Sequence, residues 1–263
     1  MLTLSGLYAQ RNGTMKRFWL ALVLMCGAIG GAQAASRDLV VGVEDIEYYP
    51  LFAIRDGEYV GAMREIVDAF ARAKDYRVTY RPLPIKRLYA ELAGGGIDVK
   101  LPDNPGWGGE AKAGLKMAYS KPVAAYIDGV VVRPGSIAKP VDQFRNLGTV
   151  AGFTPYAWLD RIKADKVALK ENPRMELLLR QAVVGHVDGA YVNVAVANHV
   201  LNNILNMQGA LIFNPALPHS RDYYHLSTTR RPEVVAEFDV WLKENAQMVK
   251  DIKDRFGAEK GVE

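Results

Sequence analysis

One unit occurs twice in this chain: an apolar helical stripe, a glycine turn, a short apolar strand and a polar loop. In the first copy Ile85, Leu88 and Leu92 have helical spacing, and "LAGGGIDVKLPDNPGW" at 92–107 supplies the turn, strand and loop. In the second copy an apolar stripe at 177–184 precedes "GHVDGAYVN". Two such units in 263 residues predict two similar α/β lobes whose polar loops face a cleft.

The segments around these units continue the alternation of strands and helices. A strand at 39–43, an amphipathic helix from Met63 and a strand at 78–80 have the order of a parallel sheet. The stretches 119–135 and 223–229 are predicted to cross between the lobes, which makes a two-strand hinge. The predicted boundaries are 35–124 with 220–263 for lobe 1 and 125–219 for lobe 2. A single long helix is expected from Pro232 to about Phe256.

Residues 1–34 have the composition of a secretory signal peptide. Lys16 and Arg17 precede an apolar run at 18–29, and the small residues up to Ala34 predict cleavage before Ala35. Residues before Met15 fit no part of such a peptide, so we expect translation to begin at Met15 and the protein to be periplasmic.

Composition narrows the possible functions further. The only cysteine, Cys26, lies in the leader, so the mature chain is predicted to have no disulfide and no thiolate nucleophile. The leader also contains three basic and no acidic residues, which nearly accounts for the net charge of +4, so nucleic acid is not an expected partner. The four histidines lack metal-ligand spacing, and we expect no metal, no cofactor and no enzymatic activity.

Polar and aromatic side chains follow the predicted strands, where ligands of open α/β sheets bind. The candidate ligand-binding residues are Glu44, Tyr48, Tyr49, Arg87, Asp103, Asn104, Trp107, Phe153, Thr154, Tyr156, Tyr191 and Asn193.

Several of these candidates also have a purely structural interpretation. Thr154 and Asn193 precede predicted helices and could be N-caps, while Arg87 could lie on a solvated helix face. Tyr48 and Tyr49 cannot both face a pocket in an extended segment, because side chains alternate. Lys100, unusual in an apolar strand, needs an acidic partner such as Asp98 or Asp103, or an anionic ligand.

The segments "LVVGVED…YYP", "DGEYVGAMREIVDAF", "GGGIDVKL", "YSKPVAAY" and "GHVDGAYVN" resemble bacterial family 3 extracellular solute-binding proteins over roughly 38–257. That resemblance implies a periplasmic-binding-protein type II fold, with two α/β lobes joined by a two-strand hinge around a ligand cleft. It also implies a monomer that delivers a small solute to an ABC permease in the inner membrane.

The chain departs from the family at both groups that bind a zwitterionic amino acid. The family's Ser/Thr-rich loop is replaced by residues 102–106, and Glu110 and Lys112 stand near the position of its carboxylate-binding arginine. The second-lobe aspartate that binds the ligand ammonium is Asn193 here. The remaining aromatic and hydrogen-bonding set suits a flat neutral or cationic solute, or an amino acid derivative with one charge blocked.

Three functions follow from the resemblance. The first is capture of a small polar, amino acid-like solute for an ABC transporter. The second is ligand sensing for a separate signalling receptor. The third is an enzyme similar to the cyclohexadienyl dehydratases, in which Glu44 or Asp103 would transfer protons.

Overall fold

Ten strands form one sheet in the computed structural model, which describes residues 37–262. The strands are hydrogen-bonded in the order β4-β1-β5-β12-β7-β10-β8-β9, with β11 beside β7 and β6 beside β12. The predicted signal peptide, its Cys26 and the predicted start at Met15 lie outside the described residues. The strands are β1 (Arg37–Glu44), β4 (Tyr76–Leu83), β5 (Val99–Asp103), β6 (Ala118–Tyr119), β7 (Ala124–Val132), β8 (Asn146–Val150), β9 (Ala168–Asn172), β10 (Gly189–Asn193), β11 (Ile212–Phe213) and β12 (Ser220–Thr228).

Asp56 and Gly57 form the turn of a separate hairpin, β2 (Ala53–Arg55) and β3 (Glu58–Val60). Both turn residues have positive φ, as a tight two-residue hairpin turn requires. The α-helices of the described residues are α1 (Ala62–Ala73), α2 (Ile85–Gly94), α3 (Gly109–Lys112), α4 (Leu159–Lys163), α5 (Met175–Val184), α6 (Val194–His199), α7 (Pro232–Glu244) and α8 (Ala246–Phe256). A π-helical turn, η4 (Val200–Ile204), continues α6.

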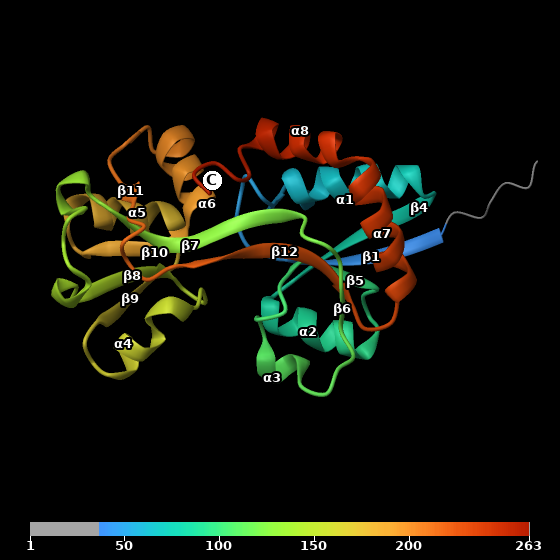
Figure 1. The fold of residues 1–263 in the computed structure, drawn as a ribbon, viewed down its shortest axis with the longest axis horizontal. Coiled ribbons are helices and arrows are strands. Elements are labelled where there is room, and N and C mark those ends of the chain that lie inside the picture. The colour runs from blue at the N-terminus through green and yellow to red at the C-terminus, as the bar shows by residue number, and fades with distance from the viewer. Residues whose placement is uncertain (1–36, 263) are drawn as a thin grey trace, which may run out of the picture. The chain divides into compact units, whose positions relative to one another are not determined.

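The long strands β7 and β12 lie side by side in the middle of the sheet (Figure 1). They pair antiparallel from Ala124↔Tyr224 to Asp128↔Ser220. Parallel pairs lie on both sides of them, β1 with β4 and β5 on one side and β8 with β9 and β10 on the other. This arrangement confirms the predicted α/β class and the two crossing segments, while the lobe boundaries stay a prediction.

Helices cover both faces of the sheet around β1 (Figure 1). On one face α1 and α7 meet through Phe70, whose ring lies 5.0 Å from Phe238 and 5.8 Å from Trp241 between centroids. On the other face Leu88 and Leu92 of α2 pack against Ile97. These contacts follow the predicted apolar stripes. Within residues 37–262, no helix is both long and apolar enough to pass through a bilayer.

Two sequence predictions of local structure were wrong. The single helix expected from Pro232 to Phe256 is two helices, because Asn245 leaves helical geometry and its amide donates to the Trp241 carbonyl at 2.9 Å. Pro102 and Asp103 were expected in an irregular loop but belong to β5, where Asp103 pairs with His225 of β12. Asp103 is therefore held in the sheet, whereas Asn104 begins the loop.

Gly61 allows the segment around Leu51, which follows Tyr48, to pack closely against the start of α1. Gly61 has φ 112°, and a Cβ at this position would lie 2.6 Å from the carbonyl oxygen of Leu51. That oxygen accepts a hydrogen bond from the Met63 amide at 3.0 Å, so it cannot easily move away. We expect Gly61→Ala to lower the free energy of unfolding by about 2–3 kcal/mol in urea titrations.

Gly57→Ala is the matched control for this substitution. Gly57 also has positive φ, at 79°, but no atom lies within 4 Å of a Cβ built on it. Its replacement should therefore cost only the backbone term, about 1 kcal/mol. Equal destabilisation by both variants would show that the contact with Leu51 contributes nothing.

Candidate functional site

The described residues bury five charged side chains, of which four are joined by ion pairs and the fifth, Asp128, lies within electrostatic reach of Glu44. They are Glu44, Lys100, Asp103, Lys112 and Asp128. Glu44 ends β1 and Asp103 ends β5, so both lie at the carboxyl edge of neighbouring parallel strands. Because burial of charge costs free energy unless the charges are paired, such a group is unexpected in a core that serves stability alone.

Lys100 joins the two strand ends. Its Nζ donates to Glu44 Oε1 at 3.1 Å and to the carbonyl oxygen of Pro102, and it lies 3.8 Å from Asp103 Oδ1. The predicted alternative partner Asp98 instead pairs with Arg231 at 3.4 Å. The ammonium of Lys100 is thus fully engaged by protein oxygens.

A second lysine closes the group at Asp103. Lys112 Nζ donates to Asp103 Oδ1 at 2.9 Å and to the carbonyl of Asn104 at 2.7 Å, and burial lowers the pKa of Lys112. Ser227 of β12 donates to the other carboxylate oxygen of Asp103 at 2.6 Å. Asn104 also donates to the carbonyl of Tyr223 at 2.9 Å. Asp103 and Asn104 are both buried and hydrogen-bonded within the protein.

Asp128 lies directly across the sheet from Asn193, on the adjacent strand. Asn193 Oδ1 accepts from the Val196 amide at 3.1 Å, as the N-cap interpretation predicted, and Nδ2 donates to Tyr224 Oη at 3.1 Å and to Asp128 Oδ1 at 3.4 Å. Burial raises the pKa of Asp128 to about 7; the Asn193 amide opposes this rise and the Glu44 carboxylate adds to it. No cationic side chain forms an ion pair with Asp128 among residues 37–262.

Aromatic rings surround these charges in two groups. The first group consists of Tyr48 from the loop after β1, Phe153 from the loop after β8, and Tyr191 of β10. The ring centroid of Phe153 lies 6.3 Å from that of Tyr48 and 6.0 Å from that of Tyr191. Tyr191 is fully buried, with its hydroxyl 3.3 Å from Ser220 Oγ. The candidate loops of both predicted lobes therefore meet at Tyr48 and Phe153.

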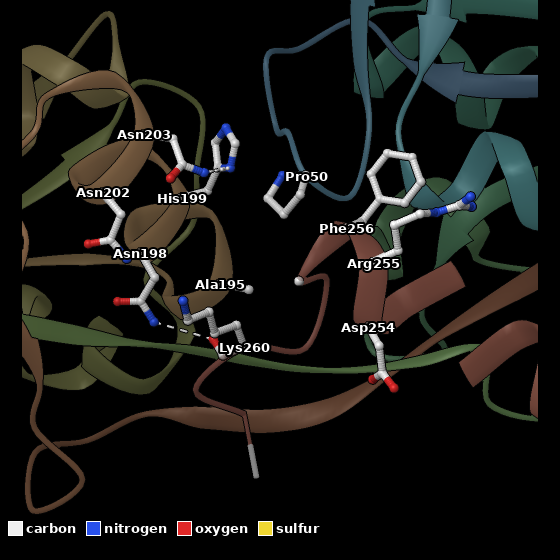
Figure 2. A pocket seen from close by; sticks show the side chains of 11 residues that line it. Pro50, Ala195, Asn198, His199, Asn202, Asn203, Asp254, Arg255, Phe256 and Lys260 are labelled. Atoms are coloured by element: carbon white, nitrogen blue, oxygen red, sulfur yellow. Dashed lines mark hydrogen bonds between the residues drawn. The ribbon is translucent and has the colours of Figure 1, made fainter. Parts of the chain in front are cut away.

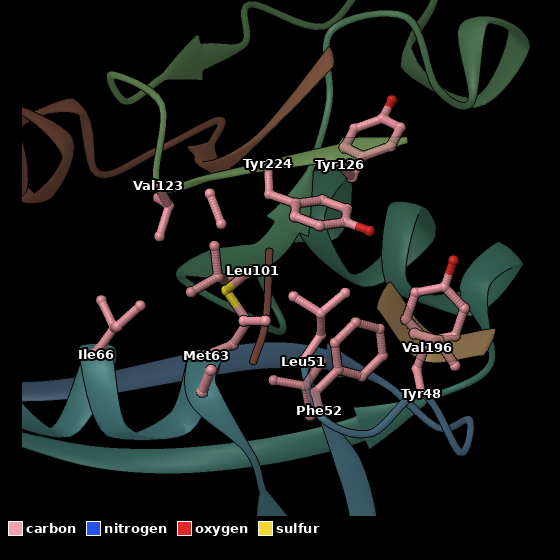
Figure 3. Close-up of a cluster of buried hydrophobic side chains, with 14 of the residues drawn as sticks. Tyr48, Leu51, Phe52, Met63, Ile66, Leu101, Val123, Tyr126, Val196 and Tyr224 are labelled. Carbon is pink, nitrogen blue, oxygen red and sulfur yellow. The ribbon is translucent and has the colours of Figure 1, made fainter. Parts of the chain in front are cut away.

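The second group consists of Trp107, Tyr126 and Tyr224. The rings of Tyr126 and Tyr224 stack with centroids 4.6 Å apart (Figure 3), and Trp107 lies 5.7 Å and 5.8 Å from them. Lys100 Nζ is 5.8 Å from the Trp107 ring. Burial and the Asp128 carboxylate raise the pKa of Tyr224 well above its ordinary value. The neutral hydroxyl of Tyr224 and the aromatic rings of this group therefore lie near Asp128.

Four predicted residues lie apart from this group. Tyr49 contacts His199 and Phe256, with centroids 4.7 Å and 6.0 Å away. Arg87, Thr154 and Tyr156 are exposed, and Tyr156 has 49% of its surface accessible. Ligand contact by these four residues stays a prediction, and the structure does not gather them with the others.

Two cavities lie away from the buried charges. One, of about 260 Å³, is lined by Pro50, by α6 and η4 through Asn198, His199 and Asn202, and by the end of α8 (Figure 2). The other, of about 370 Å³, is lined by Tyr49, Arg55 and α1. The side chains of Glu44, Asp103 and Asp128 are themselves buried, so the site is closed in this conformation.

Asp128, Tyr126 and Tyr224 were not predicted as site residues. Asp128 interrupts the apolar strand sequence "YIDGVVV" at 126–132, and an acid in a buried strand is an available signal. Tyr224 gave no signal, because tyrosine is common in strands that face a core.

The sheet order, with two antiparallel strands crossing between sets of parallel strands, defines the periplasmic-binding-protein type II fold. The arginine-, lysine-, histidine-binding protein ArtJ from Geobacillus stearothermophilus is similar at TM-score 0.64 and 20% identity, over 84% of this chain and 95% of ArtJ. A histidine kinase sensor domain with similarity to periplasmic binding proteins is similar at TM-score 0.64 and 19% identity. The similarity covers 84% of this chain and 96% of the sensor domain.

An ancestral amino acid-binding protein, AncCDT-1, described as a precursor of cyclohexadienyl dehydratase, gives TM-score 0.62 and 17% identity, over 83% and 95% of the two chains. No family model matches the chain, and no curated protein matches it in sequence. At these identities the similarities confirm the predicted fold, while membership of family 3 stays a prediction.

Proposed function

We propose that this protein is a periplasmic solute-binding protein that encloses a small polar solute between its two lobes. The observation that carries the proposal is the buried ion group of Glu44, Lys100, Asp103 and Lys112 at the carboxyl ends of β1 and β5, with the buried Asp128 in electrostatic reach of Glu44. The carboxyl ends of strands are where open α/β sheets bind ligands. Tyr48 and Phe153, from loops of different lobes, complete the wall. The buried position of these groups implies that the solute enters when the lobes separate.

Delivery of the solute to an ABC permease in the inner membrane is part of this proposal. The similarity to an arginine-, lysine-, histidine-binding protein supports a receptor for small nitrogen-containing solutes. A monomer with a cleaved leader fits such a role, since lobe closure alone changes the surface that a permease would contact.

The binding function is tested on protein produced from the full chain, freed of carried-over ligand by unfolding and refolding. Thermal unfolding is followed against amino acids, amines, polyamines, organic acids and short peptides. A solute at about 100 times its dissociation constant should add roughly 2.7 kcal/mol, which raises the melting temperature by roughly 5–10 °C. Failure of every class to raise the melting temperature of folded protein would contradict the proposal.

Sensing for a signalling receptor is the second candidate, favoured by the similarity to a histidine kinase sensor domain. The two functions differ in the partner of the closed, ligand-bound form. Cross-linking in cells should capture a permease if the protein serves transport, and a sensor kinase if it serves signalling. A dehydratase would instead consume arogenate or prephenate, with loss of turnover in a Glu44→Gln variant.

A further inference from the structure

Asp128 is a buried carboxylate of the site, and no cationic side chain of residues 37–262 forms an ion pair with it. Each lysine of the site is engaged by another acid, Lys100 by Glu44 and Lys112 by Asp103. The hydrogen bond that Asp128 accepts from another side chain comes from Asn193 at 3.4 Å, a long contact. A buried carboxylate with so little compensation is unfavourable, and its charge remains available to a ligand.

Asp128 supplies a carboxylate close to Asn193, which stands where the resembled family has its ammonium-binding aspartate. The residues are Cα partners across the antiparallel pair of β7 and β10. A carboxylate that is absent at position 193 is therefore present one strand away, with the Asn193 amide bridging Asp128 and Tyr224 Oη. The site thus retains a negative group on the second-lobe side, at a different place in the sequence.

The charges of the site favour a positive ligand and disfavour a ligand carboxylate. Three buried carboxylates face two buried ammonium groups, and no arginine is buried in residues 37–262. One positive charge from a ligand would neutralise the group. A ligand carboxylate would have to displace Glu44 or Asp103 from its lysine, with loss of a charge-assisted hydrogen bond.

The rings near Asp128 suit the same kind of ligand. Burial raises the pKa values of Tyr48, Tyr126, Tyr191 and Tyr224, and the Asp128 carboxylate adds to the rise at all four hydroxyls. Tyrosine and tryptophan faces attract cations most strongly where water is excluded. The stacked pair Tyr126 and Tyr224 provides such faces (Figure 3), and the ring of Trp107 lies against both.

We propose that the solute is an organic monocation without a free carboxylate, and that its cationic nitrogen binds Asp128 among the rings of Tyr126, Tyr224 and Trp107. This inference rests on the proposed solute-binding function and specifies its ligand class. Asp128 acts as the counter-ion that selects charge, and both buried lysines of residues 37–262 are already engaged by acids, so neither is available to the carboxylate of an amino acid.

The test compares each amine with its carboxylated counterpart on ligand-free protein from the full chain. Suitable pairs are tyramine with tyrosine, histamine with histidine and choline with glycine betaine. Calorimetry and thermal unfolding should detect binding of at least one amine, and at least 10-fold weaker binding of its carboxylated partner. Asp128→Asn should weaken amine binding by about 10- to 100-fold, the range for loss of one charged hydrogen-bond partner.

Asp251→Asn is the control for this variant. Asp251 is an exposed carboxylate on α8, outside the buried charge group, and its replacement should change amine affinity less than twofold. Asp128→Asn should also melt no lower than the unaltered protein without ligand, which separates a ligand-binding role from a structural one.

The outcomes distinguish this inference from the function on which it rests. Binding of amino acids, organic acids or neutral solutes in preference to every amine would overturn the monocation inference and leave solute binding intact. Unchanged amine affinity in Asp128→Asn would overturn the role of Asp128. Absence of binding by any solute would overturn the proposed function itself. The amine and carboxylate pairs need no variant, so the result stands even if Asp128→Asn fails to fold.

Discussion

Lys100→Met should lower the free energy of unfolding by about 3–5 kcal/mol, the cost of removing one partner from a buried ion group. The Lys100 side chain is fully buried, and its Nζ contacts Glu44 Oε1, Asp103 Oδ1 and the Pro102 carbonyl. Methionine fills similar volume but offers no donor, so the Glu44 carboxylate is left buried without its cation. Urea titration at neutral pH measures the change.

Two further variants separate charge from packing in this prediction. Glu44→Gln combined with Lys100→Met removes both members of the pair, and should recover part of the lost stability because no lone charge remains. Lys86→Met, on the exposed face of α2, makes the same chemical change outside the core and should alter stability by less than about 0.5 kcal/mol. A loss below about 1 kcal/mol for Lys100→Met would contradict the buried ion group.

The strands and helices were largely predictable because their signals are local. Gly95 and Gly185, predicted to end the two repeated helices, both adopt positive φ, at 78° and 83°. Asn193 caps α6, an interpretation that its position before a helix already offered. The division of the C-terminal helix at Asn245 was missed, since a single polar residue interrupts the apolar periodicity without a glycine or proline.

The charge pairs of the site were not predictable, because they depend on strand pairing. Lys100 reaches Glu44 because β5 pairs with β1 at Gly42↔Lys100, which puts the end of β1 beside the lysine. Asp128 reaches Asn193 through the β7–β10 register. Both contacts join residues more than fifty positions apart. Sequence could flag Lys100 as a charge inside an apolar strand, but not the acid that it meets.

Stability of the ligand-free protein should fall as pH rises from about 4 to about 7, through Asp128. Burial raises the pKa of this carboxyl from 3.8 to about 7 in the folded protein. Between these values the folded protein holds a proton that the unfolded chain has released, so the free energy of unfolding decreases with pH and levels off above about 7. The full contribution is at most about 4 kcal/mol.

Comparison with Asp128→Asn isolates this effect from other titrating groups. His199, whose pKa is lowered by burial, acts in the opposite direction by lowering stability as pH falls below its ordinary value of 6.5, but it does so equally in both proteins. The difference in unfolding free energy, measured by urea titration at intervals from pH 4 to pH 8, should therefore increasingly favour Asp128→Asn as pH rises. A difference that is independent of pH would show that Asp128 does not change its protonation in this range. A monocation that binds the ionised Asp128 carboxylate should reduce the pH dependence of the unfolding free energy of the unaltered protein. The ligand supplies the positive partner that Asp128 lacks among residues 37–262, which favours the ionised form in the folded protein.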